Sequence, residues 1–366
     1  MTQSLLELDL PAADAIDRTG FDLGWDHARH GLVPAPELLH EATPVGQGWR
    51  AARATFGQRT LAASAPLRLQ LALRTAAWRQ GISFDVLQVT PNHLAQIQST
   101  RCPVLRCALG GATSEPTAAV VERLNPQAGY AAGNLVVMSR RAAEARAGLD
   151  LLDLVRRARR AERAGEPEDG LPAAAWWRLA ALQSYATPLR LHEAASLPLA
   201  VLPPNRVRLL NAAQGLQALL TLQFVAPGFS QRLRDVAAQL PEHTLRQDFN
   251  LFIGALLPRV LEAGDEPAAR RRALEDAWLG ERVQRRWQHF VLSLGEAALE
   301  TLLQRLDAGT PGVKVLHHSS AGATEGWALE RRGRLRVAPG DAHADRPLEA
   351  LPPLRQRRAA DRPRAA

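Results

Sequence analysis

Two short valine-rich segments separated by a glycine-containing loop constrain this chain more than any other feature. Val120-Val121 and Val136-Val137 have the composition of β-strands. The loop between them contains Gly129 and Gly133, which permit the positive φ angles of tight turns. A helix-forming segment starts directly after the second strand. The order predicts an antiparallel hairpin followed by a helix.

The rest of the chain is expected to be mainly α-helical. We expect a helical N-terminal region over residues 1–100, with a surface loop at residues 24–30. A small module over 101–165 contains the hairpin and ends in an arginine-rich helix. A polar linker at 166–170 precedes an all-α domain over 171–307. The last part, 308–366, is predicted to hold a small hairpin at 327–337 and a disordered basic tail.

The all-α domain is divided by proline and glycine. Breaks at Pro227-Gly228, Pro241 and Gly264 separate its predicted helices, of which the last is expected to run from Arg282 to Leu306. Its tryptophans have two interpretations: a groove for a protein partner, or the filling of a helical core, which is the commoner role. They are Trp176, Trp177, Trp278 and Trp287.

The positive charge is concentrated in two places. The chain of 366 residues has a net charge of +8, and all but one of its basic Lys and Arg residues are arginine. Residues 101–165 contain eleven arginines and six acidic residues, and the tail 353–366 contains five arginines and one acid. A local excess of arginine favours a polyanionic partner. A GC-rich codon bias would also raise the arginine content.

The cysteines and the apolar runs exclude several classes. Cys102 and Cys107 are the only cysteines, so a disulfide framework and a four-cysteine zinc site are excluded. His93 is either a metal ligand near Cys102 or, as expected, a solvent-facing residue. No apolar run reaches the roughly 18–20 residues of a membrane span, and residues 1–14 lack Lys and Arg. We therefore expect a cytoplasmic protein without a membrane partner.

The segment 121–144 resembles the ββα-metal core of the HNH (His-Me finger) nucleases. The string Asn125-Pro126 through Gly129-Tyr130 to Gly133-Asn134 carries the resemblance, which covers about 45 residues. It is also similar to an unnamed group of bacterial proteins that share this loop. The family pattern implies that Glu122 takes the place of a metal-binding Asp and Arg123 that of the general-base His. Asn134 matches the residue that orients this base.

The helix that follows departs further from the family pattern. Ala143, or Glu144 in a shifted register, occupies the position of the second metal ligand, and Arg146 is the trailing basic residue. Ser139 and Ala142 stand where some relatives have cysteines. In this fold the helix lies against the DNA minor groove, so the resemblance implies that Arg140, Arg141 and Arg146 bind nucleic acid.

These replacements bear directly on catalysis. A general base must lose its proton near neutral pH, and arginine, with a pKa above roughly 12, cannot. Glu122 could bind Mg²⁺ or Mn²⁺, but one carboxylate makes a weak site unless a phosphate completes it. The sequence therefore favours a nucleic-acid-binding protein with a degenerate HNH-like module. The alternatives are a metal-dependent endonuclease that uses Glu122 and Asn134, and a helical scaffold for an unknown protein partner.

Overall fold

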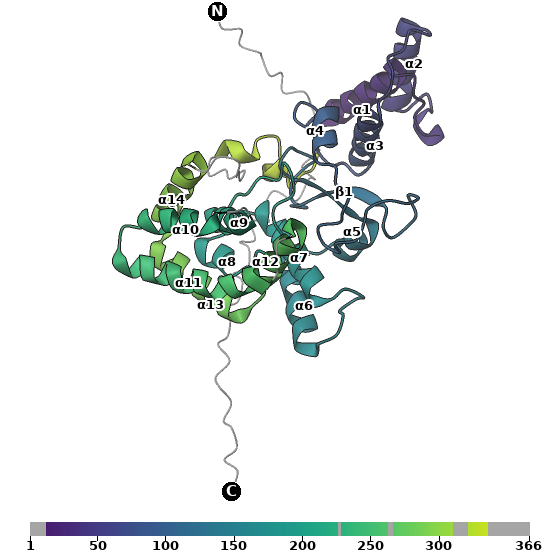
Figure 1. The fold of residues 1–366 in the computed structure, drawn as a ribbon. Coiled ribbons are helices and arrows are strands. Elements are labelled where there is room, and N and C mark those ends of the chain that lie inside the picture. Colours follow the sequence, from purple (N-terminus) through teal and green to yellow (C-terminus); the bar gives the residue numbers. More distant parts are fainter. Residues whose placement is uncertain (1–11, 226–227, 263–265, 310–320, 336–366) are drawn as a thin grey trace, which may run out of the picture. The chain divides into compact units, whose positions relative to one another are not determined.

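The structure is a computed structural model that describes residues 12–225, 228–262, 266–309 and 321–335. Over these residues the chain is mainly helical, with fourteen α-helices and one two-stranded sheet (Figure 1). It forms two compact units. The described residues of 1–147, 203–209 and 318–343 belong to the first unit, and those of 148–202 and 210–317 belong to the second.

The first unit begins with four helices. They are α1 (Ala12–Arg29), α2 (Pro44–Phe56), α3 (Ala65–Arg79) and α4 (Pro91–Gln96). α1 packs along α2 at very short range, because a Cβ on Gly24 would lie only 1.9 Å from the Val45 carbonyl oxygen. The surface loop expected at residues 24–30 is therefore wrong. Gly24 belongs to a helix and permits the close packing of two backbones.

The predicted hairpin and helix are present. β1 (Ala119–Arg123) pairs antiparallel with β2 (Leu135–Ser139), and α5 (Arg140–Arg146) follows directly. All five residues of β2 are buried, and the Ser139 hydroxyl caps α5 by accepting from the Ala142 amide at 3.4 Å. One apolar core joins this hairpin to α4. It consists of Val89, Leu94, Ile97, Val121, Leu135 and Val137.

Three segments far apart in the sequence converge on the loop between the strands. Tyr130 exchanges backbone hydrogen bonds with Ser83 and Asp85, both at 2.8 Å. The Arg208 amide donates to the Gly133 carbonyl at 3.1 Å. Trp327 accepts from the Gly129 amide at 2.7 Å and donates its ring N–H to the Ala132 carbonyl at 3.1 Å. The loop is therefore a structural centre of the first unit.

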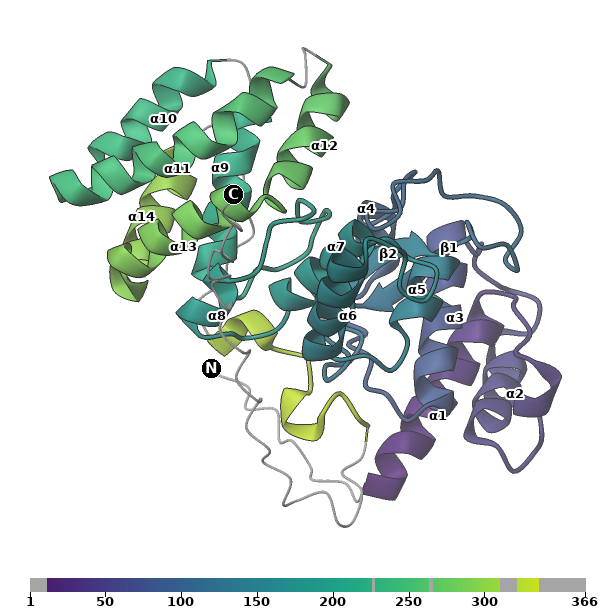
Figure 2. The ribbon, with the colours of Figure 1, turned by 90° about the horizontal axis from the view of Figure 1, so that it is seen from below.

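The second unit is all-α. Its helices are α6 (Leu151–Ala164), α7 (Ala173–Tyr185), α8 (Leu191–Ala195), α9 (Ala212–Val225), α10 (Phe229–Ala238), α11 (His243–Glu262), α12 (Pro267–Ala277), α13 (Glu281–Leu294) and α14 (Glu296–Gly309). α9 packs against α8, α10, α12 and α14, while α11 packs against α13 (Figure 2). α6 packs against α7. The arginine-rich helix that the sequence placed with the hairpin thus belongs to the second unit.

The four tryptophans of this unit fill its interior. Trp176, Trp278 and Trp287 are fully buried and Trp177 is 7% exposed. Trp278 and Trp287 make an edge-to-face contact with 5.3 Å between ring centroids. The core role predicted for these residues is confirmed, and they do not form an exposed groove.

Two predicted elements differ from the observed ones. The helix expected over 282–306 is two helices, because Gly295 ends α13 with φ +78° and ψ 163°. In place of the hairpin expected over 327–337, the described part forms a 3-10 turn at Leu329–Arg331 and pairs Arg334 with Ile82. The disordered tail, predicted from residue 338 on, lies outside the described residues. Within the described part, none of the helices combines the length and apolarity needed to cross a bilayer.

Candidate functional site

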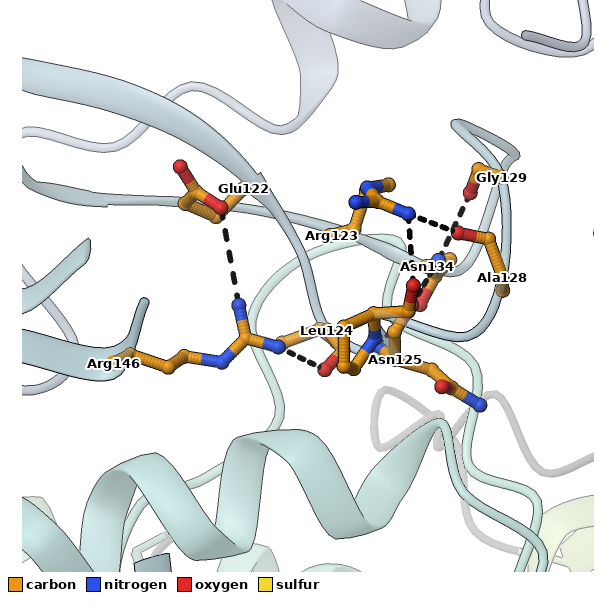
Figure 3. A network of polar contacts seen from close by, with 9 residues as sticks. Glu122, Arg123, Leu124, Asn125, Ala128, Gly129, Asn134 and Arg146 are labelled. Carbon is orange, nitrogen blue, oxygen red and sulfur yellow. Dashed lines mark hydrogen bonds and ion pairs between the residues drawn. The ribbon is translucent and has the colours of Figure 1, made fainter. Parts of the chain in front are cut away.

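The hairpin sets the positions of Glu122 and Arg123 at the end of β1. Glu122 lies opposite Val136 and Arg123 opposite Leu135 in the ladder. Neighbouring residues of a strand point to opposite faces, so the two side chains have different surroundings. Figure 3 shows them side by side along the strand, Glu122 directed toward Arg146 and Arg123 toward the loop.

Glu122 is paired with a buried arginine. Its carboxylate lies 3.8 Å from the Arg146 guanidinium, which also donates a 2.5 Å hydrogen bond to the Leu124 carbonyl. Burial lowers the pKa of Arg146 to about 10, so this guanidinium stays charged at neutral pH. Burial raises the pKa of Glu122, although Arg146 and Arg123 both act in the opposite direction. The pair ties β1 to the last turn of α5.

Arg123 holds the loop. Its guanidinium donates to the carbonyls of Pro126 at 3.0 Å and Ala128 at 2.6 Å (Figure 3), and it lies 5.4 Å from the centroid of the Tyr130 ring. Burial lowers its pKa from the ordinary value for arginine, while Tyr130 and Glu122 raise it. A guanidinium held by two carbonyls supports the backbone and cannot accept a proton from water.

Asn134 is fully buried, and its side-chain amide makes hydrogen bonds to the same loop. The side-chain oxygen accepts from the Asn125 amide at 2.7 Å. The side-chain nitrogen donates to the carbonyls of Asn125 at 3.2 Å and Gly129 at 3.0 Å. Both N–H donors of the amide group are therefore used within the loop. These contacts account for an asparagine at this position on structural grounds.

The donor set at Glu122 does not fit a divalent cation. Across the described residues, no three His, Cys, Asp or Glu side chains are grouped so that they could hold a metal ion. Ala143 offers no ligand atom, and Glu144 is exposed with Arg140 at 3.6 Å from its carboxylate. The remaining carboxylate, Glu122, faces a charged guanidinium, which repels a cation and competes for the same oxygen.

Four arginines flank a contact that brings α5 beside a turn formed by residues 101–108. The Cys102 sulfur accepts from the Ser139 amide at 3.4 Å and lies 3.3 Å from its hydroxyl. Arg140 and Arg141 follow Ser139, and Arg141 is exposed. Arg101, also exposed, and Arg106 belong to the turn. Sequence reasoning named only Arg140 and Arg141, since the arginines beside the two cysteines gave no sign of where their turn packs.

His93 lies in surroundings other than those expected, and Arg208 has a role that the sequence did not indicate. His93, expected to face solvent, is only 9% exposed, and its Nε2 atom has no hydrogen-bond partner among the described residues. Burial lowers the pKa of His93, and Arg206 and Arg208 lower it further. Arg208 donates to the Ala323 carbonyl at 2.7 Å. Its role had no sequence signal, because its side-chain hydrogen-bond partners, Ala323 and Gln88, lie more than a hundred positions away.

Comparison with known proteins adds no relative: this chain matches no family model, no curated protein and no solved structure.

Proposed function

We propose that this protein binds double-stranded DNA through the module formed by β1, β2 and α5, and that the module is an HNH-like core that no longer hydrolyses its ligand. The order of its elements and the Gly129-to-Asn134 loop support the resemblance. The contacts of Arg123, at the position of the general base, and of Glu122, at the position of a metal ligand, support the loss of catalysis. Arg123 is held by loop carbonyls, and Glu122 is paired with Arg146.

The observation that carries the proposal is the grouping of Arg101, Arg106, Arg140 and Arg141 around the contact between Cys102 and Ser139. Four arginines adjacent in the chain to this contact can neutralise phosphates along a duplex and release counterions. The arginines of α6 are a weaker candidate, because two of them lie closer to acidic side chains than Arg140 lies to Glu144, at 3.6 Å. Arg160 lies 2.8 Å from Glu168, and Arg157 is paired with Asp169.

A salt titration of the full-length protein tests the proposal. We expect binding of a fluorescent duplex of about 20 base pairs at low salt, with an affinity that falls steeply as salt rises. Replacing both Arg140 and Arg141 by Gln should reduce the slope of log K against log salt by about two, because each lost phosphate contact removes roughly 0.9. The matched control is Arg285→Gln with Arg286→Gln, an exposed consecutive pair on α13, and it should keep the slope.

Two results would contradict the proposal: an absence of binding at low salt, or equal slopes for the two double variants. Circular dichroism of both variants establishes that the helices are intact before the slopes are compared.

The enzyme alternative is separated by a nicking assay. Supercoiled plasmid is incubated with Mg²⁺ or Mn²⁺ and either the natural protein or Glu122→Ala. We expect no nicking that depends on Glu122, because this carboxylate is engaged by Arg146. Metal-dependent nicking that disappears in Glu122→Ala would establish the endonuclease instead.

A further inference from the structure

Cys102 and Cys107 lie opposite each other in the turn of residues 101–108. Arg101 pairs with Ala108 in an antiparallel bridge, and the Cys102 amide donates to the Cys107 carbonyl at 2.9 Å. Directly opposed residues of an antiparallel pair have Cα atoms roughly 4.5–5.5 Å apart. A disulfide needs roughly 4.4–6.8 Å. Both thiols are free.

The Cys102 sulfur also contacts Ser139, the residue that caps α5. It accepts from the Leu105 amide within the turn and from the Ser139 amide, both at 3.4 Å. The Ser139 hydroxyl, 3.3 Å from the same sulfur, caps α5. Because one sulfur atom cannot keep all of these contacts while it turns toward Cys107, bond formation within the turn must alter the start of α5.

We propose that Cys102 and Cys107 are an oxidation site at which peroxide forms an intramolecular disulfide, and that this bond releases Ser139 and loosens the first turn of α5. This inference does not depend on DNA binding.

The chemistry balances in two steps. The half-exposed Cys107 loses its proton and its sulfur attacks one oxygen of hydrogen peroxide. The O–O bond breaks, and the products are a sulfenic acid and water. The sulfur of Cys102, which is only 1% exposed, then attacks the Cys107 sulfur. The S–O bond breaks, and hydroxide leaves as water with the Cys102 proton. Two thiols and one peroxide thus give one disulfide and two waters.

The exposure of the two thiols sets the order and the pace of these steps. Cys107 reacts first because peroxide can reach it. Burial and the neighbouring Cys102 raise the pKa of the Cys107 thiol, so little of it is thiolate at neutral pH. The site should therefore respond to sustained peroxide rather than to traces, and faster at higher pH.

The test treats the full-length protein with hydrogen peroxide and then with an alkylating agent. We expect a monomer on a non-reducing gel, no alkylated thiol, and an intact mass lower by two hydrogens, all reversed by dithiothreitol. Cys107→Ser should form no such bond. Hydrogen exchange at the amides of residues 142–146 should accelerate roughly fivefold on oxidation, the effect typical of a lost N-cap. Amides of α13 serve as the internal reference.

Ser139→Ala supplies the matched variant. It lacks the cap before oxidation, so its α5 amides should exchange fast when reduced and should not accelerate further when oxidised. The assignment of the site is wrong if both thiols remain alkylable, if disulfide-linked dimers form, or if Cys107 proceeds to a sulfinic acid. A disulfide that leaves α5 exchange unchanged in the natural protein refutes the coupling. No readout involves DNA, so failure here is distinct from failure of the proposed function.

Discussion

At the scale of single residues, three polar side chains of the hairpin module make hydrogen bonds to the backbone of its loop. Arg123, Asn134 and Arg146 all donate to carbonyls of residues 124–129. Sequence reasoning assigned them to catalysis or DNA contact, because a residue type reveals its donors and charge but not its partners. A buried donor must be satisfied, and an irregular loop offers many free carbonyls. Hydrogen bonds to the loop carbonyls thus account for these residue types.

His93 leads to a prediction on pH. Burial, Arg206 and Arg208 place its folded-state pKa below the ordinary 6.5. Below that pH the unfolded state binds more protons than the folded state, so acidification removes stability. His93→Gln should therefore lose less of its thermal midpoint between about pH 7 and pH 5 than the natural protein does. His243→Gln, at an exposed position, is the control. Equal losses in the natural protein and His93→Gln would refute the argument.

At the scale of elements, the sequence identified where strands and helices form more reliably than where they end. The valine segments and the loop glycines gave β1, β2 and α5 because local conformational preference and burial agree there. The stretch 282–306 has an uninterrupted helical pattern in which Gly295 is a tolerated residue. Only the backbone angles at Gly295 divide it into α13 and α14.

A pair of glycine substitutions tests this break. With φ +78° and ψ 163°, Gly295 occupies a region that is essentially restricted to glycine. Gly295→Ala should lower the free energy of unfolding of the second unit by about 1–3 kcal/mol. Gly254 is exposed within α11, and a Cβ added to it would meet no atom within 4 Å, so Gly254→Ala should raise this free energy by up to about 1 kcal/mol. Urea unfolding followed by tryptophan fluorescence measures both, and effects of the same sign would contradict the assignment.

At the scale of the whole molecule, the first unit depends on contacts between distant parts of the chain. Its central loop is held by Ser83, Arg208 and Trp327. Trp327 is fully buried although the residues around it have no helical or strand pattern. The described segment 321–335, which the sequence predicted to lie in a separate last part of the chain, thus belongs to the first unit.

Trp327 therefore offers a test at this scale. Trp327→Ala should cost about 3–5 kcal/mol of stability in the first unit, the range for a buried aromatic. Trp327→Phe should cost less, because it keeps most of the apolar contact and loses the hydrogen bond to Ala132. Hydrogen exchange at the amides of Gly129 and Tyr130 reports the loss, with amides of α11 as the reference. Unchanged exchange in Trp327→Ala would show that the segment does not hold the loop.

The sequence by itself determined the mainly helical class, the hairpin with its following helix and the unsuitability of Arg123 as a base, because these follow from local conformational preference and intrinsic acidity. Only the tertiary structure decided that Arg146 pairs with Glu122, that Cys102 touches Ser139, and that Arg208 and Trp327 hydrogen-bond to the loop. Such pairings join residues separated by up to 195 positions. Their free energy comes from burial and hydrogen bonding in three dimensions, which no local pattern records.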